Sequence, residues 1–306
     1  MTDYRALLRE LAIPRLVGTP NHARVRAALK RELAGRGFVV DEHAFSGRPA
    51  GALLGAPRLV QGVNLIAQRP SGRAHLPPRV WLVAHYDSKG QPISMATRLL
   101  GVLALAAVAP LLAAGLAADR AWAFLPALAV LMGGVAVMAR NRVSDASAGA
   151  VDNASALIAV LMVLDLLGEP GGGGGGGVGV VFPDAEEYGL VGTRRLVVER
   201  GELLRDAAVV NFDGLDDCGR PFAVLHRAGP VGRAVAAAVG ARRMPWLPVI
   251  VDGLTLARGA RDCVTIMKGA WSTARIVHTE GDTPDRLTLA GARQVAEGVA
   301  RAITDP

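Results

Sequence analysis

The sequence contains an apolar segment that ends in two adjacent acids, Val180-Val181-Phe182-Pro183-Asp184-Ala185-Glu186-Glu187-Tyr188-Gly189-Leu190. Its first residues predict a buried strand, and the Gly-Leu pair after the acids predicts a turn. Open α/β sheets bind their ligands at such carboxyl-terminal strand ends. Because two adjacent carboxylates repel each other, a nearby cation would stabilise them there. The alternative is a solvated helix N-terminus, where the helix dipole favours acids, and the pair alone leaves both interpretations open.

Other segments end in metal-ligand side chains in the same way. His85 and Asp87 follow a predicted buried strand at residues 80–84, and Asp213 follows a predicted strand at 207–212. His278 follows a predicted strand at 274–277, and Asp152 precedes an apolar helix predicted at 156–167. The pattern therefore predicts that ligand-type side chains converge at one edge of a sheet.

The remaining segments complete an α/β pattern. Helices are predicted at residues 7–11, 20–35, 192–199, 229–241 and 287–303, and further strands at 38–45, 62–68 and near 248–251. The glycine run at 171–177 precedes a strand instead of a helix, so we interpret it as a flexible connector and not as a dinucleotide-binding loop. The expected fold is a three-layer αβα domain around a mixed, largely parallel sheet.

The amino-acid composition limits the classes of protein to which the chain can belong. Hydrophobic residues make up 51% of the 306 residues but aromatic residues only 4%, which suits helices and buried parallel strands. The net charge of +7 comes from arginines spread along the chain without interleaved aromatics, which argues against a nucleic-acid partner. Cys218 and Cys263 form no CxxC motif or disulfide framework. The first residues carry no apolar signal-peptide core, so no cleavable signal is expected.

Two long apolar runs interrupt the pattern. Residues 99–118 and 121–139 contain no charged side chain and are separated only by Asp119-Arg120. Twenty helical residues span roughly 30 Å, the thickness of a hydrocarbon core, so the runs predict a transmembrane helical hairpin that contacts lipid. The alternative is a pair of alanine-rich soluble helices packed on the domain. Pro110 and Pro126 within the runs, and the weak hydrophobicity of alanine, are consistent with this alternative.

The hairpin divides the chain and suggests its orientation. We expect one α/β domain built from residues 1–96 and 141–306, with the hairpin inserted at 97–140. Arg98, Arg140 and Arg142 flank the apolar runs, so the positive-inside rule places both ends and the attached domain on the cytoplasmic side of an integral membrane protein.

The converging side chains suit zinc, which prefers imidazole and carboxylate ligands. A single site with four ligands would leave one of these carboxylates without a metal ion. Two ions that share one bridging carboxylate would use all of the side chains as ligands except Glu186, which would remain free. Paired ions about 3.5 to 4 Å apart can clamp both oxygens of a hydrolysis.

Taken together, the motifs resemble those of the co-catalytic zinc aminopeptidases, metallopeptidase family twenty-eight of clan MH, whose relatives include glutamate carboxypeptidases and glutaminyl cyclases. The resemblance covers about residues 15 to 303 apart from the hairpin. It rests on five segments in the family's order: Ala84-His85-Tyr86-Asp87-Ser88, Gly149-Ala150-Val151-Asp152-Asn153-Ala154-Ser155, Ala185-Glu186-Glu187-Tyr188-Gly189-Leu190-Val191-Gly192-Thr193, Phe212-Asp213, and His278-Thr279-Glu280-Gly281-Asp282-Thr283-Pro284-Asp285.

The resemblance implies a role for each residue. Asp152 bridges two zinc ions, His85 and Asp213 complete one, and Glu187 and His278 complete the other. Asp87 accepts a hydrogen bond from the His85 ring, and Glu186 is the general base that takes a proton from the attacking water and returns it to the leaving amine. The resemblance also implies a cis peptide between Asp152 and Asn153.

The expected function is therefore a membrane-anchored di-zinc metallopeptidase, of aminopeptidase type, acting on a peptide or an aminoacyl small molecule. One alternative is a single-zinc acyltransferase similar to glutaminyl cyclase. Another is a non-catalytic membrane scaffold of the same fold, which the presence of Glu186 argues against. Asp216, Asp217 and Cys218 are further metal-ligand candidates, and Asp262 resembles a family position near the substrate pocket. His22, His43, His75 and His226 are interpreted as surface or packing residues.

Overall fold

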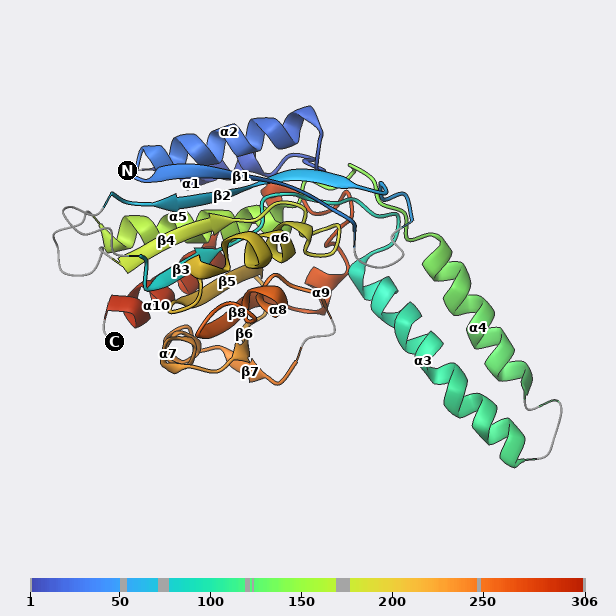
Figure 1. Cartoon of the computed structure of the whole chain (residues 1–306). Coiled ribbons are helices and arrows are strands. Elements are labelled where there is room, and N and C mark those ends of the chain that lie inside the picture. Colours follow the sequence, from blue (N-terminus) through green and yellow to red (C-terminus); the bar gives the residue numbers. More distant parts are fainter. Residues whose placement is uncertain are drawn as a thin grey trace.

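An eight-stranded mixed sheet forms the centre of the protein in a computed structural model (Figure 1). The structure describes residues 2–49, 54–70, 77–118, 122, 124–168, 177–246 and 249–304. The strand order is β1-β2-β4-β3-β5-β8-β6-β7. Pairing is parallel for β4/β3, β3/β5, β5/β8 and β6/β7 and antiparallel for the others. The mixed α/β fold predicted from the sequence is thus confirmed.

The strands are β1 (Val39–Gly47), β2 (Val60–Gln68), β3 (Val80–Val83), β4 (Val178–Phe182), β5 (Ala208–Leu215), β6 (Arg220–Arg227), β7 (Arg242–Met244) and β8 (Asp262–Gly269). The helices are α1 (Tyr4–Leu11), α2 (Pro20–Ala34), α3 (Met95–Ala117), α4 (Phe124–Ala139), α5 (Ser155–Leu167), α6 (Val191–Arg200), α7 (Pro230–Ala238), α8 (Gly253–Leu256), α9 (Trp271–Ala274) and α10 (Ala290–Thr304).

Helices cover both faces of the sheet. The larger core lies between the sheet and α1, α2, α5, α7 and α10, and a smaller core joins the other face to α6 and α8. Every residue of β3 and β4 is buried. Buried parallel strands favour β-branched side chains, which explains their valine content.

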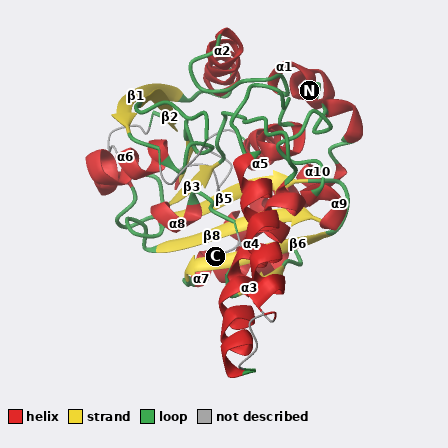
Figure 2. Ribbon diagram, turned by 90° about the vertical axis from the view of Figure 1, so that its right-hand side faces the viewer, coloured by secondary structure: helices red, strands yellow, loops and turns green. Residues whose placement is uncertain are grey.

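The apolar runs form an antiparallel pair of helices, α3 and α4, which we call the hairpin; it projects away from the sheet (Figures 1 and 2). Among the described residues, two helices are long and apolar enough to cross a membrane, α3 and the helix through Ala150–Leu167. The second is 83% buried and is therefore a core helix, whereas α3 is 11% buried. Helix α4 has 16 residues and is shorter than the predicted run of 121–139. The turn at Asp119-Arg120 lies outside the described residues.

In the C-terminal third, the helices predicted at 229–241 and 287–303 are present as α7 and α10, but two predicted strands are not. Residues 274–277 do not form a strand, because they belong to the end of α9 and the turn that follows. The sheet instead contains β6 and β8, which the sequence analysis missed. Residues 249–251 are not a strand either, and the short β7 lies earlier. The glycine run at 171–176, His75 and Pro248 lie outside the described residues.

A buried arginine joins the first loop to the segment that precedes α5. Arg15 has no exposed surface, and its guanidinium donates to four backbone carbonyls. The distances are 2.7 Å to Tyr86 O, 2.5 Å to Ala148 O and 3.0 Å to Gly149 O. Since Gly149 lies three residues before Asp152, Arg15 fixes the backbone that leads into the predicted metal ligand.

We expect Arg15→Met to lower the free energy of unfolding by about 3 kcal/mol or more, because buried carbonyls would lose a charged donor. In a detergent-solubilised chain this corresponds to a fall in melting temperature of roughly 6 to 12 °C. Arg9→Met, at an exposed position of α1, is the matched control and should leave the melting temperature unchanged. Equal melting temperatures for both variants would contradict this role.

Candidate metal centre

The two adjacent acids lie in the turn that follows β4. Glu186 and Glu187 are both buried, at 8% and 3% exposure. Their backbone N–H groups donate to Oδ1 and Oδ2 of Asp87, each at 3.1 Å. Ala185, directly before them, has a φ of 56°, in the left-handed region, and the chain turns sharply at this residue. Asp87 therefore holds the main chain of the pair from the end of the neighbouring strand β3.

Asp184 fixes the start of the same turn. Its Oδ1 accepts from the Ala185 N–H at 2.8 Å and lies 2.8 Å from His22 Nε2. Its Oδ2 accepts from the Val63 N–H at 2.8 Å and from the Tyr86 hydroxyl at 2.9 Å. A fully buried carboxylate with this many donors is compensated for the loss of water, so the turn is tied rigidly to β2 and β3.

Asp152 enters the site from an irregular turn at the start of α5. The peptide bond between Asp152 and Asn153 is cis, as the family resemblance implied. The carboxylate of Asp282 accepts from the N–H groups of Val151 at 2.7 Å and Asp152 at 3.2 Å. Asn153 bonds to Phe212 O and to the Gly214 N–H, which fastens this turn to β5 on both sides of Asp213.

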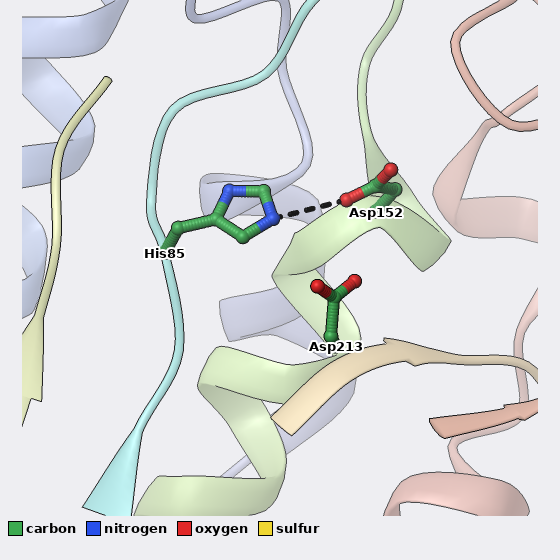
Figure 3. Close-up of side chains that lie close together, drawn as sticks. All are labelled: His85, Asp152 and Asp213. Carbon is green, nitrogen blue, oxygen red and sulfur yellow. Dashed lines mark ion pairs between the residues drawn. The ribbon is translucent and has the colours of Figure 1, made fainter. Parts of the chain in front are cut away.

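The first metal group consists of His85, Asp152 and Asp213 (Figure 3). One ligand atom from each lies within 4.8 Å of the others, and all three residues are buried. His85 Nε2 is 3.1 Å from Asp152 Oδ1. His85 follows β3 as predicted, whereas Asp213 lies within β5, which continues past an irregularity between Phe212 and Leu215.

The second metal group consists of Asp152, Glu187 and His278. His278 Nε2 is 2.9 Å from Asp152 Oδ2 and 3.1 Å from Glu187 Oε1. His278 has a φ of 66° in the turn after α9, so it reaches the site from a loop instead of the predicted strand end. Asp152 belongs to both groups, one carboxylate oxygen facing each histidine.

The electrostatics of the site reflect several buried acids in close proximity. Burial raises the pKa of Glu186 well above its ordinary value; His85 opposes this, and Glu187, Asp252 and Asp213 add to it. Burial together with Asp152 likewise raises the pKa of Asp213 well above its ordinary value.

The pKa values of Asp152 and Glu187 shift in the opposite direction. Burial alone would raise the pKa of Asp152, but the adjacent imidazoles of His278 and His85 outweigh it and hold the pKa well below its ordinary value. Burial would also raise the pKa of Glu187, but the charges of His278 and Lys89 lower it to about 2. The ionised carboxylates of both acids of the second metal group are therefore favoured.

These residues fit a divalent metal ion. Among the described residues, Asp152 Oδ1, Glu187 Oε1 and His278 Nε2 are buried polar atoms without a hydrogen-bond partner. Such atoms are costly to bury unless something compensates them. The two carboxylate oxygens can each offer a lone pair to a cation, as can His278 Nε2 when the ring proton is on Nδ1. This mixture of imidazole and carboxylate donors suits zinc.

Asp87 is placed beside His85, but its main contacts differ from those expected. His85 Nδ1 and Asp87 Oδ1 are 3.4 Å apart without hydrogen-bond geometry. The Asp87 carboxylate instead receives the N–H groups of the two glutamates. We regard these 3.1 Å bonds as its principal role here, and its orientation of the His85 ring stays a prediction.

The other candidates lie outside the two metal groups. Asp216 accepts from Thr273, and Asp217 accepts from the backbone and hydroxyl of Thr288. Cys218 is an exposed cysteine. Asp262 was expected near the substrate pocket but lies at the opposite end of β8, where it accepts from the Gly232 N–H at 2.9 Å. Of the histidines, His43 and His22 are buried and paired with acids.

Three further side chains at the site were not predicted from the sequence. Lys89 Nζ lies 2.8 Å from Glu187 Oε2, and Arg98 Nη2 lies 2.5 Å from His278 Nδ1. Asp252 accepts from Thr193 at 2.7 Å, and burial raises its pKa to about 6. Lys89 follows the Ala84–Ser88 motif directly, which was an available signal, whereas the position of Asp252 depends on a loop between distant elements.

A cavity of about 590 Å³ opens at the metal groups. Asp152, Glu186, Glu187, Asp213 and His278 line one side of it. A space of this size accommodates a small-molecule or peptide-end substrate beside the predicted general base.

Comparison with solved structures finds the same fold in two kinds of enzyme. An aminopeptidase, LapA of Legionella pneumophila, has a TM-score of 0.64 and 13% identity, over 99% of this chain and 70% of that one. A glutaminyl cyclase of Porphyromonas gingivalis has a TM-score of 0.64 and 19% identity, over 98% of this chain and 95% of that one. A leucine aminopeptidase precursor of Bacteroides thetaiotaomicron has a TM-score of 0.62 and 16% identity, over 99% of this chain and 96% of that one.

At such low identities the structures show a shared fold and do not separate the two activities. No curated protein matches the sequence at a significant level. The sequence model of Peptidase family M28 matches residues 64–303, which include both metal groups, Glu186 and Asp87. The chain therefore belongs to peptidase family M28.

Proposed function

We propose that the chain is a membrane-anchored hydrolase of aminopeptidase type that holds two zinc ions. The observation that carries the proposal is the pair of metal groups that share Asp152, with Glu186 beside them. Such a shared carboxylate can bridge two ions, and the family includes peptidases. When bound, the zinc ions would polarise the substrate carbonyl and acidify a water molecule.

Glu186 is the residue best placed to move protons. It is buried, it faces the cavity, and its Oε2 lies 4.0 Å from His85 Nε2. Burial raises the pKa of Glu186, and a carboxylate with a raised pKa is a stronger base that can accept a proton in one step and return it in the next. We infer that Glu186 takes a proton from the attacking water and delivers it to the leaving amine. The N–H groups of Glu186 and Glu187 donate to the Asp87 carboxylate, which fixes the main chain from which the Glu186 side chain extends.

The second candidate function is glutaminyl cyclisation, which the likeness to the Porphyromonas gingivalis enzyme supports equally on grounds of fold. In that reaction an N-terminal glutamine closes on its own side-chain amide and releases ammonia. It would use a single zinc, held by the second metal group, with Glu186 moving the proton. Metal content and the released product therefore separate the two candidates. A non-catalytic scaffold would need neither metal nor Glu186.

The hairpin supports the membrane proposal. Helix α3 is 23 residues long and largely exposed, and α4 adds a shorter apolar helix beside it. Exposed apolar helices of this kind are stabilised by lipid. Arg98, Arg140 and Arg142 at the domain end of the hairpin favour a cytoplasmic catalytic domain.

Zinc content tests whether two zinc ions share Asp152 as a ligand. We expect two zinc ions in the wild-type chain, one in His85→Ala and none in Asp152→Ala, measured by plasma mass spectrometry on purified protein. His226→Ala is the matched control, since this histidine bonds to Thr265 outside both groups. One zinc in the wild type, retained in His85→Ala, would favour the cyclase.

Replacing the base should stop turnover without removing metal. For Glu186→Gln we expect kcat to fall by about 10² to 10⁴ on a panel of aminoacyl amides, because proton transfer is lost. Zinc content should stay at the wild-type value. Glu202→Gln, an exposed acid, is the control and should keep full activity. Undiminished turnover in Glu186→Gln would refute the assignment of the base.

Extraction of membranes with alkaline carbonate tests the anchor. We expect the full chain to stay in the membrane pellet, because two apolar helices hold it by hydrophobic burial. A chain in which residues 99–139 are replaced by a short Gly-Ser linker, with Arg98 and Arg140 kept, should appear in the supernatant. Release of the full chain by carbonate would show that the hairpin is a soluble element.

A further inference from the structure

The cavity at the metal groups has a second, apolar wall that the proposed chemistry does not use. Leu99 and Val102 of α3 and Met138 of α4 line it from the hairpin. Ile250 and Trp271 line it from the catalytic domain. Ile250 is 63% exposed and Trp271 is 55% exposed, so this apolar surface lies open beside the hairpin.

The apolar wall begins directly at the metal groups. Arg98 lies in the first turn of α3, and its Nη2 is 2.5 Å from Nδ1 of the ligand His278. Val102 is four residues further along the same helix, and therefore on the same face and roughly 6 Å beyond Arg98. A group that extends from the reacting centre along α3 passes from the guanidinium to apolar side chains within one helical turn.

A short polar substrate would leave this wall in contact with water. A hydrocarbon chain would cover it, and burial of apolar surface is the main favourable term in such binding. The wall also continues into the exposed apolar surface of the hairpin, where Leu100, Leu103 and Leu112 are all exposed. A chain that protrudes from the cavity would therefore remain in an apolar environment.

We propose that the substrate is an amphiphilic amide, with its amide at the metal groups and a hydrocarbon chain against the base of the hairpin. The inference rests on the proposed function for the bond that is broken. In hydrolysis the water oxygen bonds to the carbonyl carbon, the C–N bond breaks, and the proton held by Glu186 passes to the leaving nitrogen. The products are a free carboxylate and an amine, one of which carries the chain.

The test uses glutaminyl n-alkyl amides with ethyl, butyl, hexyl and octyl groups, on the chain reconstituted in lipid nanodiscs. Hydrolysis of these amides releases the alkylamine and cyclisation releases ammonia, so one series follows both candidate reactions. A parallel series of amino acid ethylamides with straight side chains of the same lengths places the hydrocarbon on the acyl side. The hydrocarbon binds from either the amine side or the acyl side, so in one of the two series we expect KM to fall roughly two- to fourfold for each added methylene.

The variants Val102→Asn and Leu103→Asn separate the cavity wall from the lipid-facing surface. Both residues are exposed on the same helix, at 52% and 65%, but only Val102 lines the cavity. We expect Val102→Asn to flatten the dependence of KM on chain length and Leu103→Asn to preserve it. Partition of the substrates into lipid is the same for both variants and cancels in the comparison.

A binding measurement distinguishes failure of the amphiphilic substrate from failure of the proposed hydrolase function. The dissociation constants of the same amides for Glu186→Gln, measured by calorimetry, should show the same dependence on chain length as KM. Turnover without any dependence on chain length in either series would overturn the amphiphilic substrate and leave the hydrolase standing. Chain-dependent binding without hydrolysis or cyclisation would refute the proposed function and retain the apolar site. Equal flattening by Val102→Asn and Leu103→Asn would overturn the assignment of the wall.

Discussion

The structure depends on the burial of several carboxylates around one point. Asp152 shares its two oxygens between His85 and His278, with Asp213 and Glu187 close on either side. In a site with little water, like charges at these separations repel strongly, and desolvation adds to the cost. The opposed pKa shifts, downward for Asp152 and upward for Asp213, express that competition. A divalent cation at the unpartnered oxygens would relieve it, which is why the arrangement is best understood as a metal centre.

A second set of carboxylates, outside the two metal groups, holds the backbone that carries the candidate ligands. Asp87 receives the N–H groups of both glutamates, Asp184 receives those of Ala185 and Val63, and Asp282 receives those of Val151 and Asp152. Each satisfies backbone donors that a tight turn would otherwise leave buried and unpaired. The ligand positions are therefore fixed by the main chain. A centre that must place reacting groups within tenths of an ångström needs this kind of support.

The hairpin contributes to the site as well as to the proposed anchor. Because it is inserted between His85 and Asp152, its base lies next to the ligands that those two motifs supply, and Arg98 contacts His278 directly. The same apolar residues that would interact with lipid then continue along the cavity wall. Position relative to the membrane and choice of substrate would be coupled through one element, and neither property follows from the α/β fold alone.

The central strands, the two apolar runs and the candidate metal ligands could all be predicted from the sequence, because each prediction depends on a local pattern. The patterns are buried valine-rich strands followed by acids or histidine, and uncharged segments of nearly twenty residues. The sequence did not determine β6 and β8 or the turn that carries His278, since short apolar stretches such as 262–269 and 274–277 have similar local patterns. Long-range packing selects β8 as the strand that pairs with β5. Packing also separates the acids that meet in the two candidate metal groups from those that accept hydrogen bonds from the backbone. Asp252, directly before α8, lies close enough to His85 for their charges to interact, whereas Asp262, at the start of β8, accepts a hydrogen bond from Gly232 instead. This difference depends on long-range packing and not on residue type.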